Sequence, residues 1–261
     1  MEIIGYCLAL FVGITLGLIG SGGSILTVPI LVYLFHINPS LATSYSLFIV
    51  GIAALLGSYK HYLLGNLKID AALNFGLPSI IVVLFTRNVL LPIIPDNLFT
   101  IGNLIVSKSI LLMLVFALLM IAASLSMIVS KNYSNQNIIN KKRLILVGLL
   151  VGFVTGLLGA GGGFLIIPAL IFFAGLSMKQ AVGTSLFIIA INSLIGFTGD
   201  ILNGISINTN LLSIFSLLAI TGIFFGTYLS KKIDGNKLKP IFGWFVLVMG
   251  FYIVIKEIFI K

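Results

Sequence analysis

The stretch Gly17-Leu-Ile-Gly-Ser-Gly-Gly-Ser-Ile-Leu-Thr-Val-Pro29 recurs 139 positions later as Gly156-Leu-Leu-Gly-Ala-Gly-Gly-Gly-Phe-Leu-Ile-Ile-Pro168. The similarity extends without a gap over residues 12–57 and 151–196, where 18 of the 46 paired positions are identical. Two similar halves with glycine-interrupted hydrophobic segments at matching positions are typical of transporters that bind substrate between internal repeats. The repeat therefore predicts a duplicated architecture and the place of a binding site.

The composition is that of a membrane protein. The 261-residue chain is 59% hydrophobic and 8% charged, too apolar for a soluble domain. Uncharged runs of about the length of a bilayer span recur along it. Backbone groups in hydrocarbon must be hydrogen-bonded within their own segment, so these runs are predicted to be helices of a multi-pass cell-membrane protein. The runs are 3–20, 41–58, 71–86, 109–130, 144–159, 181–198, 211–230 and 241–255.

The chain divides into a first transmembrane repeat (1–130), a basic cytoplasmic linker (131–143) and a second repeat (144–261). The first run lacks a basic leader region and its pattern returns at residue 144, so we expect it to be retained rather than cleaved. The net charge of +9 is expected in cytoplasmic loops, not on a nucleic-acid-binding surface.

The second segment of each half, 24–35 and 163–174, is short. Twelve helical residues reach about 18 Å, less than the roughly 30 Å hydrocarbon core. Segments one and two therefore form either one broken span or a hairpin with its tip inside the protein. With hairpins, 11 of the 15 basic residues are cytoplasmic; with broken spans only 8 are. The positive-inside rule favours hairpins. The predicted fold is all-α, with two inverted-topology repeats, each a glycine-rich hairpin plus three spanning helices, and both termini outside.

The two glycine-rich turns are the first candidate site. Glycine permits left-handed backbone angles and close approach of the backbone to a ligand. Each turn also leads into a short helix, whose N-terminus attracts anions. We expect the two tips to meet near the middle of the membrane around one substrate; the alternative is that the glycines only permit tight helix packing. The candidate substrate-binding residues are Ser21, Gly22, Gly23, Ser24, Gly161, Gly162 and Gly163.

Polar side chains within the spans are further candidates. Ser46 and Ser185 occupy equivalent positions near the start of a spanning helix, where a hydroxyl can donate to an oxyanion. Asn192 lies inside another apolar run, as a ligand residue or as an interhelical hydrogen-bonding group. The alternative for the serines is a bond to their own helix backbone.

Ionisable residues are scarce in the predicted spans. Asp200 ends one span and is expected to be interfacial, while Arg87 is expected outside, as an anchor or as an attractor of anions. His36 and His61 are expected in solvated loops, and Cys7 as a buried, inert thiol. The sequence shows no metal-ligand spacing, no nucleotide-binding motif and no reactive pair at membrane depth, so neither a cofactor nor an enzymatic activity is expected.

At these residues the chain resembles the TauE/SafE, or sulfite exporter, family of membrane transporters. The resemblance rests on the doubled glycine-rich elements 17–29 and 156–168, on 42–48 and 181–187, and on the glycines that follow the third segments, Gly65 and Gly204. It implies a carrier of sulfite, thiosulfate or organosulfonates.

The sequence thus predicts a secondary transporter of small sulfur-containing anions, coupled to an ion gradient. The expected partners are the anionic substrate and the lipid bilayer; a homo-oligomer is left open and no nucleic acid is expected. Two alternatives are a carrier of another small anion or metabolite and a permease subunit driven by a separate ATPase.

Overall fold

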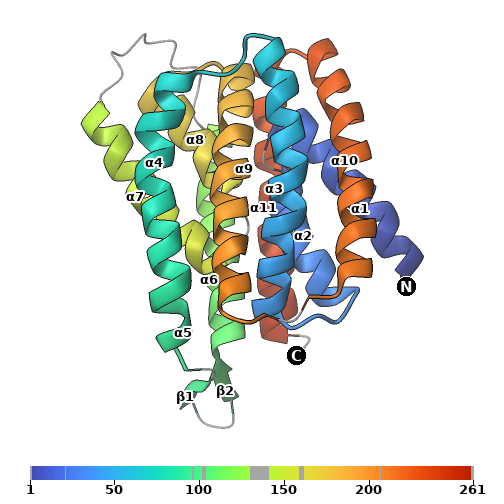
Figure 1. Ribbon diagram of the computed structural model, residues 1–261, viewed down its shortest axis with the longest axis vertical. Helices are drawn as coiled ribbons and strands as arrows, with labels where there is room; N and C mark the ends of the chain where they lie inside the picture. The colour runs from blue at the N-terminus through green and yellow to red at the C-terminus, as the bar shows by residue number, and fades with distance from the viewer. Residues whose placement is uncertain are drawn as a thin grey trace.

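The computed structural model describes residues 2–20, 22–95, 97–101, 104–129, 141–158, 162–205 and 207–259. It is a helical bundle (Figure 1). In chain order the elements are α1 (Glu2–Ile19), α2 (Gly22–Tyr33), α3 (Pro39–Leu63), α4 (Ile69–Phe85), the π-helical turn η1 (Thr86–Leu90), α5 (Leu91–Ile93), β1 (Asn97–Ile101), β2 (Leu104–Ser107), α6 (Lys108–Val129), α7 (Lys141–Leu158), α8 (Gly163–Ala174), α9 (Met178–Leu202), α10 (Thr209–Lys232) and α11 (Gly235–Phe259).

The predicted all-helical membrane architecture is confirmed. Among the described residues, five helices are long and apolar enough to span a bilayer: α3, α4 with its extension to Ile93, α6, α9 and α10. The outward face of α4 shows why the protein needs lipid. Four large apolar side chains spaced four residues apart are 47–67% exposed along it, a stripe that a soluble protein would bury. They are Leu73, Leu77, Ile81 and Phe85.

The first two segments form a hairpin, as the distribution of basic residues predicts. A Cβ placed on Gly23 of α2 would lie 2.4 Å from the Val12 carbonyl oxygen and 2.9 Å from Leu16 Cβ, both on α1. In one continuous span these residues would lie far apart along the axis, so α1 and α2 lie side by side. Figure 1 shows the α2–α3 connection and the α8–α9 connection at opposite ends of the bundle. The inverted orientation of the two repeats in a membrane stays a prediction.

Helices α3 and α9 form the central pair. They run antiparallel, because Leu47 contacts Gly196 near one end while Gly57 contacts Leu186 near the other. The remaining contacts are paired between the halves: α1 packs on α10 as α7 packs on α4, and α6 packs on α11. This is the pattern that a two-fold relation between the halves would produce.

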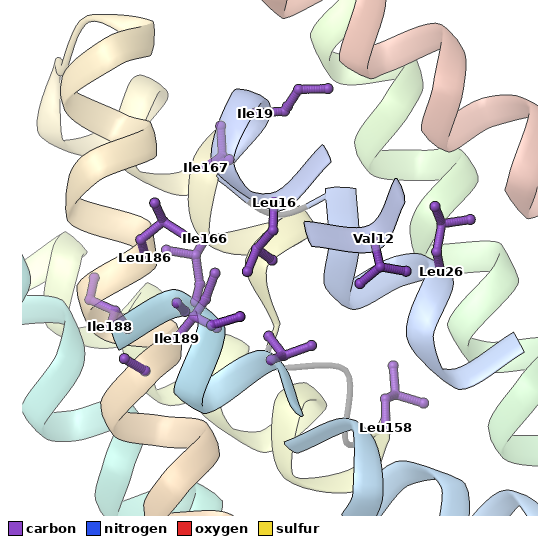
Figure 2. Packing of buried hydrophobic residues seen from close by; sticks show 14 of the residues in the cluster. Val12, Leu16, Ile19, Leu26, Leu158, Ile166, Ile167, Leu186, Ile188 and Ile189 are labelled. Carbon is purple, nitrogen blue, oxygen red and sulfur yellow. The ribbon is translucent and has the colours of Figure 1, made fainter. Parts of the chain in front are cut away.

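The apolar core lies where the hairpins meet the central pair. Leu16 of α1, Ile166 of α8 and Leu186 of α9 belong to one buried cluster (Figure 2). The cluster therefore places both hairpins against α9, the helix that carries Ser185 and Asn192.

Glycines allow the outer helices to approach the backbone of their partners. A Cβ on Gly222 or Gly226 of α10 would lie only 2.2 or 2.1 Å from a carbonyl oxygen of α1, and Gly13 of α1 is equally close to α10. Gly148 and Gly152 of α7 approach the α4 carbonyls in the same way. Small residues at helix seams are how membrane helices gain close packing without a hydrophobic driving force.

Three details differ from expectation. Helix α7 begins at Lys141, so three basic residues assigned to the linker are helical; the rest of the linker that precedes it lies outside the described residues. Cys7 is exposed on α1 rather than buried. The segment after α5 forms an antiparallel β-hairpin, β1–β2, which pairs Thr100 with Ile105 and which the apolar pattern did not predict.

Replacing Gly226 by Ala should destabilise the protein, because the new methyl would overlap the Ile14 carbonyl oxygen. Overpacking of this kind costs about 1–3 kcal/mol. The matched control is Gly76→Ala on α4, where the added Cβ meets only ordinary contacts of 3.6 Å or more with Ile188. Thermal unfolding in detergent should show a lower melting temperature for Gly226→Ala alone. Equal melting temperatures would contradict the close-packed seam.

Candidate functional site

The first glycine-rich turn lies against the start of α9. Gly20 has a left-handed backbone, with φ of +85°, and a Cβ there would lie 2.9 Å from Val182 Cγ1 and 3.0 Å from Ser185 Oγ. The turn thus meets one of the two predicted serines. The Ser185 hydroxyl, however, donates to the Val182 carbonyl at 2.9 Å, which is the backbone-bonded alternative for this residue.

The second turn is described from Gly162 onwards. Gly162 is also left-handed, with φ of +66°, and Gly163 begins α8. A Cβ on Gly162 would lie 1.9 Å from Thr155 Oγ1 of α7. The Gly162 backbone is therefore packed directly on a hydroxyl group.

The structure does not test several of the predicted substrate-binding residues. Ser21 and Gly161 lie outside the described residues, as does the side chain of Ser24. Gly22 is the first residue of α2. Gly23 packs on α1, so the tight-packing alternative accounts for its lack of a side chain.

Buried hydroxyls without partners mark the second turn and its surroundings. Thr86, Thr155 and Ser46 are each 0–1% exposed, and their hydroxyl oxygens make no hydrogen bond among the described residues. Thr86 packs on Gly156, the residue next to Thr155. Leaving a buried hydroxyl unpaired costs about 1–3 kcal/mol, so each is a ready donor for a ligand that brings acceptor oxygens.

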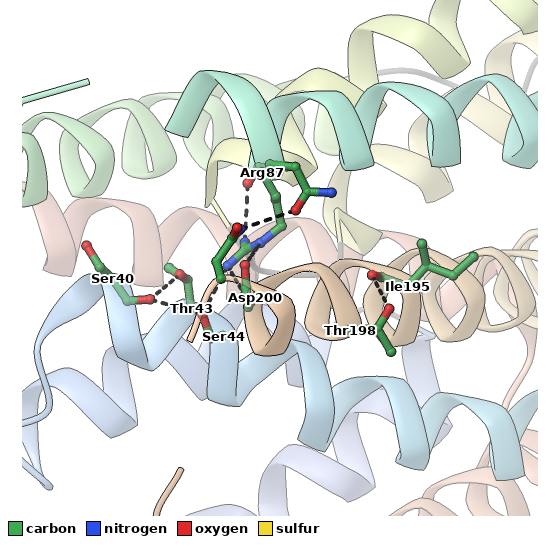
Figure 3. A network of polar contacts seen from close by, with 10 residues as sticks. Ser40, Thr43, Ser44, Arg87, Ile195, Thr198 and Asp200 are labelled. Atoms are coloured by element: carbon green, nitrogen blue, oxygen red, sulfur yellow. Dashed lines mark hydrogen bonds and ion pairs between the residues drawn. The ribbon is translucent and has the colours of Figure 1, made fainter. Parts of the chain in front are cut away.

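A buried ion pair lies beside this cluster (Figure 3). Arg87 Nε donates to Asp200 Oδ1 at 2.8 Å and Nη2 donates to Oδ2. The same guanidinium donates from Nη2 to Ser44 Oγ at 3.1 Å and from Nη1 to the Gly156 carbonyl at 3.3 Å. Arg87 and Asp200 are only 2% and 3% exposed, so neither is the exposed surface charge that the sequence suggested; their side and depth in the membrane stay predictions.

The π-helical turn explains how Arg87 reaches this position. It follows α4 without a break and adds one residue to a helical turn, a distortion that often occurs at functional sites. The guanidinium links η1 to the start of α3, the end of α7 and the end of α9, and thus joins the two halves of the chain.

The structure does not bring Ser46 and Ser185 together. Phe48, one half-turn beyond Ser46, contacts the Phe197 ring with a centroid separation of 4.9 Å. Ser185 lies twelve residues earlier on α9, about 18 Å along the helix. The two serines therefore lie at different heights along the bundle axis. The short helices of the two hairpins, α2 and α8, do contact each other.

Asn192 lies apart from both turns. Its Nδ2 donates to Ser79 Oγ of α4 at 2.7 Å, and its Oδ1 has no partner among the described residues. It lines a small, mainly apolar pocket between α4 and α9. The interhelical bond supports the structural alternative for this residue.

Comparison with known proteins agrees with this architecture. The family model described as "Sulfite exporter TauE/SafE" matches residues 6–253. The chain belongs to the TauE/SafE sulfite exporter family. No solved structure matches it.

Relatives of this TauE/SafE chain carry the same kind of name. A "Probable membrane transporter protein" of Xylella fastidiosa is 29% identical, over 93% of this chain and 91% of the relative. "Probable membrane transporter protein MJ0441" of Methanocaldococcus jannaschii is 28% identical, over 95% of each chain. "Probable membrane transporter protein YjnA" of Bacillus subtilis is 28% identical, over 95% of this chain and 97% of the relative. The protein is thus a multi-pass integral membrane protein of a transporter family.

The sequence of this TauE/SafE chain did not lead us to predict Thr86, Thr155 or the ion pair as parts of the site. One signal was available for Thr155: its counterpart in the first repeat, 139 positions earlier, is Leu16. Gly23 packs on Leu16 just as Gly162 packs on Thr155. The glycine of the turn thus packs on an apolar side chain in the first half and on a hydroxyl group in the second.

The two histidines differ. His36 is exposed, as expected. His61 is not in a solvated loop, because α3 continues to Leu63 and the imidazole is 0% exposed. Among the described residues, no group of three or more His, Cys, Asp or Glu side chains is arranged to hold a metal ion.

Ser46→Ala and Ser185→Ala separate an unpaired hydroxyl from a backbone-bonded one. The Ser46 hydroxyl has no partner among the residues that the structure describes, so its loss should weaken binding of a small oxyanion by about tenfold or more, the value of a hydrogen bond to a charged group. Ser185→Ala should change affinity little. Binding to the purified variants, with thermal stability measured alongside, tests this; an unchanged affinity for Ser46→Ala would remove Ser46 from the site.

Proposed function

We propose that this TauE/SafE protein is a secondary transporter of small sulfur-containing anions, such as sulfite, thiosulfate or organosulfonates, coupled to an ion gradient. We place the anion site beside the second glycine-rich turn, at Gly162 and Gly163. The observation that carries this placement is the pair of buried hydroxyls on Thr86 and Thr155, which make no hydrogen bond to any residue that the structure describes.

The donors around this turn suit an oxyanion. The hydroxyls supply two hydrogen bonds, and the N-terminus of α8 supplies backbone N–H groups and a partial positive charge. Arg87 has five N–H groups, of which four are used in bonds to Asp200, Ser44 and Gly156. Among the described contacts, one Nη1–H of Arg87 makes no hydrogen bond and is available to a ligand.

The ion pair also limits the strength of binding. Asp200 neutralises Arg87, so an arriving anion meets hydrogen-bond donors and partial charges instead of an uncompensated cation. A carrier must release its substrate as well as bind it, and binding that is too strong would block release. The neutral pair therefore suits a transport site better than a bare buried arginine.

The asymmetry between the turns favours one principal site rather than two. Thr155 supplies a hydroxyl at the second turn where Leu16 supplies a hydrocarbon side chain at the first. The sulfur chemistry of the substrate is supported by family membership. A permease subunit driven by a separate ATPase remains the second candidate, and stimulation of transport by ATP with a partner protein would favour it.

Uptake of labelled sulfite, thiosulfate and sulfate into proteoliposomes, with and without a pH gradient, tests the function. We expect uptake of at least one reduced sulfur anion without ATP. If none of the three is transported under either condition, the proposed substrate class is wrong.

Thr155→Val tests the placement of the site. Valine has nearly the same shape and removes an unpaired buried donor, so folding should be unaffected or improved. Loss of a hydrogen bond to an anion should lower its affinity by about tenfold or more. The matched control is Thr198→Val, whose hydroxyl is exposed and bonded to the Ile195 carbonyl. Equal transport by both variants would exclude Thr155 from the site.

A further inference from the structure

His61 is a buried imidazole at the end of the central pair opposite to Arg87. It lies in the last turn of α3 and its side chain is 0% exposed. Nδ1 lies 3.5 Å from the side-chain nitrogen of Asn66. Nε2 makes no hydrogen bond among the described residues. Histidine is the side chain that ordinarily titrates near neutral pH.

The internal repeat relates His61 to Asp200. Residue 61 and residue 200 are separated by the same 139 positions that relate the two halves. His61 packs on Gly183 of α9, and Gly183 is the counterpart of Ser44, which bonds Arg87. His61 is therefore the first-repeat equivalent of Asp200.

The two ends differ in their counter-charge. At one end, Asp200 is held by Arg87. At the other end, Gly17, the counterpart of Gly156, packs on Thr227 of α10, whose hydroxyl donates to its own helix at Ile223. In its packing Thr227 is thus the counterpart of Thr86, which packs on Gly156, and the ion-paired Asp200 at one end corresponds to the titratable His61 at the other.

His61 also lies next to the first glycine-rich turn. Its Cβ would be 3.0 Å from a Cβ on Gly183, and the neighbours of Gly183, Val182 and Ser185, contact Gly20. An anion has to reach the first turn before it can interact with this imidazole.

The charged groups that the described contacts place on the elements around His61 are cations. On α3, Lys60 lies with its ammonium 4.3 Å from the Phe224 ring centroid. Lys68 follows the loop, where its backbone N–H donates to Thr184 Oγ1 of α9. On α10, Lys231 acts on the imidazole electrostatically, and on α1 the Gly17 backbone faces it. Lys231 opposes a positive charge on His61, and an anion beside the imidazole would offset that opposition.

From this placement we infer that His61 is the proton-binding residue that couples anion movement to a pH gradient: it takes up a proton when the anion reaches the first glycine-rich turn and loses it when the anion leaves. This rests on the proposed function, since it assumes an anion carrier. Anion binding and protonation then favour each other by the same factor.

Thiosulfate is the probe, because it does not titrate near neutral pH and any proton taken up must come to the protein. Calorimetric titration in buffers of different ionisation enthalpy counts protons bound with each thiosulfate. Bound thiosulfate that distributes between the second and the first glycine-rich turn should bring a fraction of one proton per anion to the wild-type protein near neutral pH. Its affinity should rise by about fivefold or more from about pH 8 to about pH 6, at the lower end of known coupling strengths. Binding without proton uptake by the wild type would overturn the inference, whatever the variants do.

His61→Gln keeps a polar side chain that cannot titrate. It should retain thiosulfate counterflow between proteoliposome compartments while losing accumulation driven by a pH gradient and the proton uptake on binding. His36→Asn, at the exposed histidine with φ of +54°, is the matched control and should behave as wild type. Gradient-driven accumulation by His61→Gln equal to wild type would contradict the role of His61. Absence of counterflow in the wild type would instead reject thiosulfate as a substrate.

Discussion

The buried pair between Arg87 and Asp200 is the interaction on which the arrangement of the two halves depends. It joins residues 113 positions apart in the sequence, and the remaining donors of the guanidinium bind the start of α3 and the end of α7. Neither charge can be left alone in an apolar interior, because an unpaired buried ion costs several kcal/mol. The pair therefore fixes four helix ends at one level of the bundle, next to the hydroxyls of Thr86 and Thr155.

The glycines serve two different purposes around this fixed point. Those at the α1–α10 and α4–α7 seams let backbones touch, so the hairpins are held firmly on their outer side. Gly20 and Gly162 instead adopt left-handed angles at the inner tips, where an added side chain would be strained. The duplicated sequence thus produces two similar hairpins, and a few substitutions at matching positions make them chemically different. Thr155 in place of Leu16 and Asp200 in place of His61 are the clearest cases.

The helices and the hairpin shape were predictable from sequence, because apolar runs and the 139-residue repeat are local or periodic signals. The site was only partly predictable. Arg87 and Asp200 were assigned to surfaces since each borders an apolar run, and nothing local reveals a partner 113 residues away. His61 was placed in a loop because the apolar run ends at Ser58, whereas α3 continues to Leu63. Unpartnered hydroxyls such as Thr155 become recognisable only when the neighbours that fail to bond them are known.

A double-mutant cycle on the ion pair tests this account most directly. Arg87→Met and Asp200→Leu each leave one buried charge and should each destabilise the protein by about 3–5 kcal/mol, whereas the double variant should recover most of that loss. Thermal or denaturant unfolding in the same detergent gives the comparison. Losses that simply add in the double variant would contradict the claim that this pair holds the two halves together.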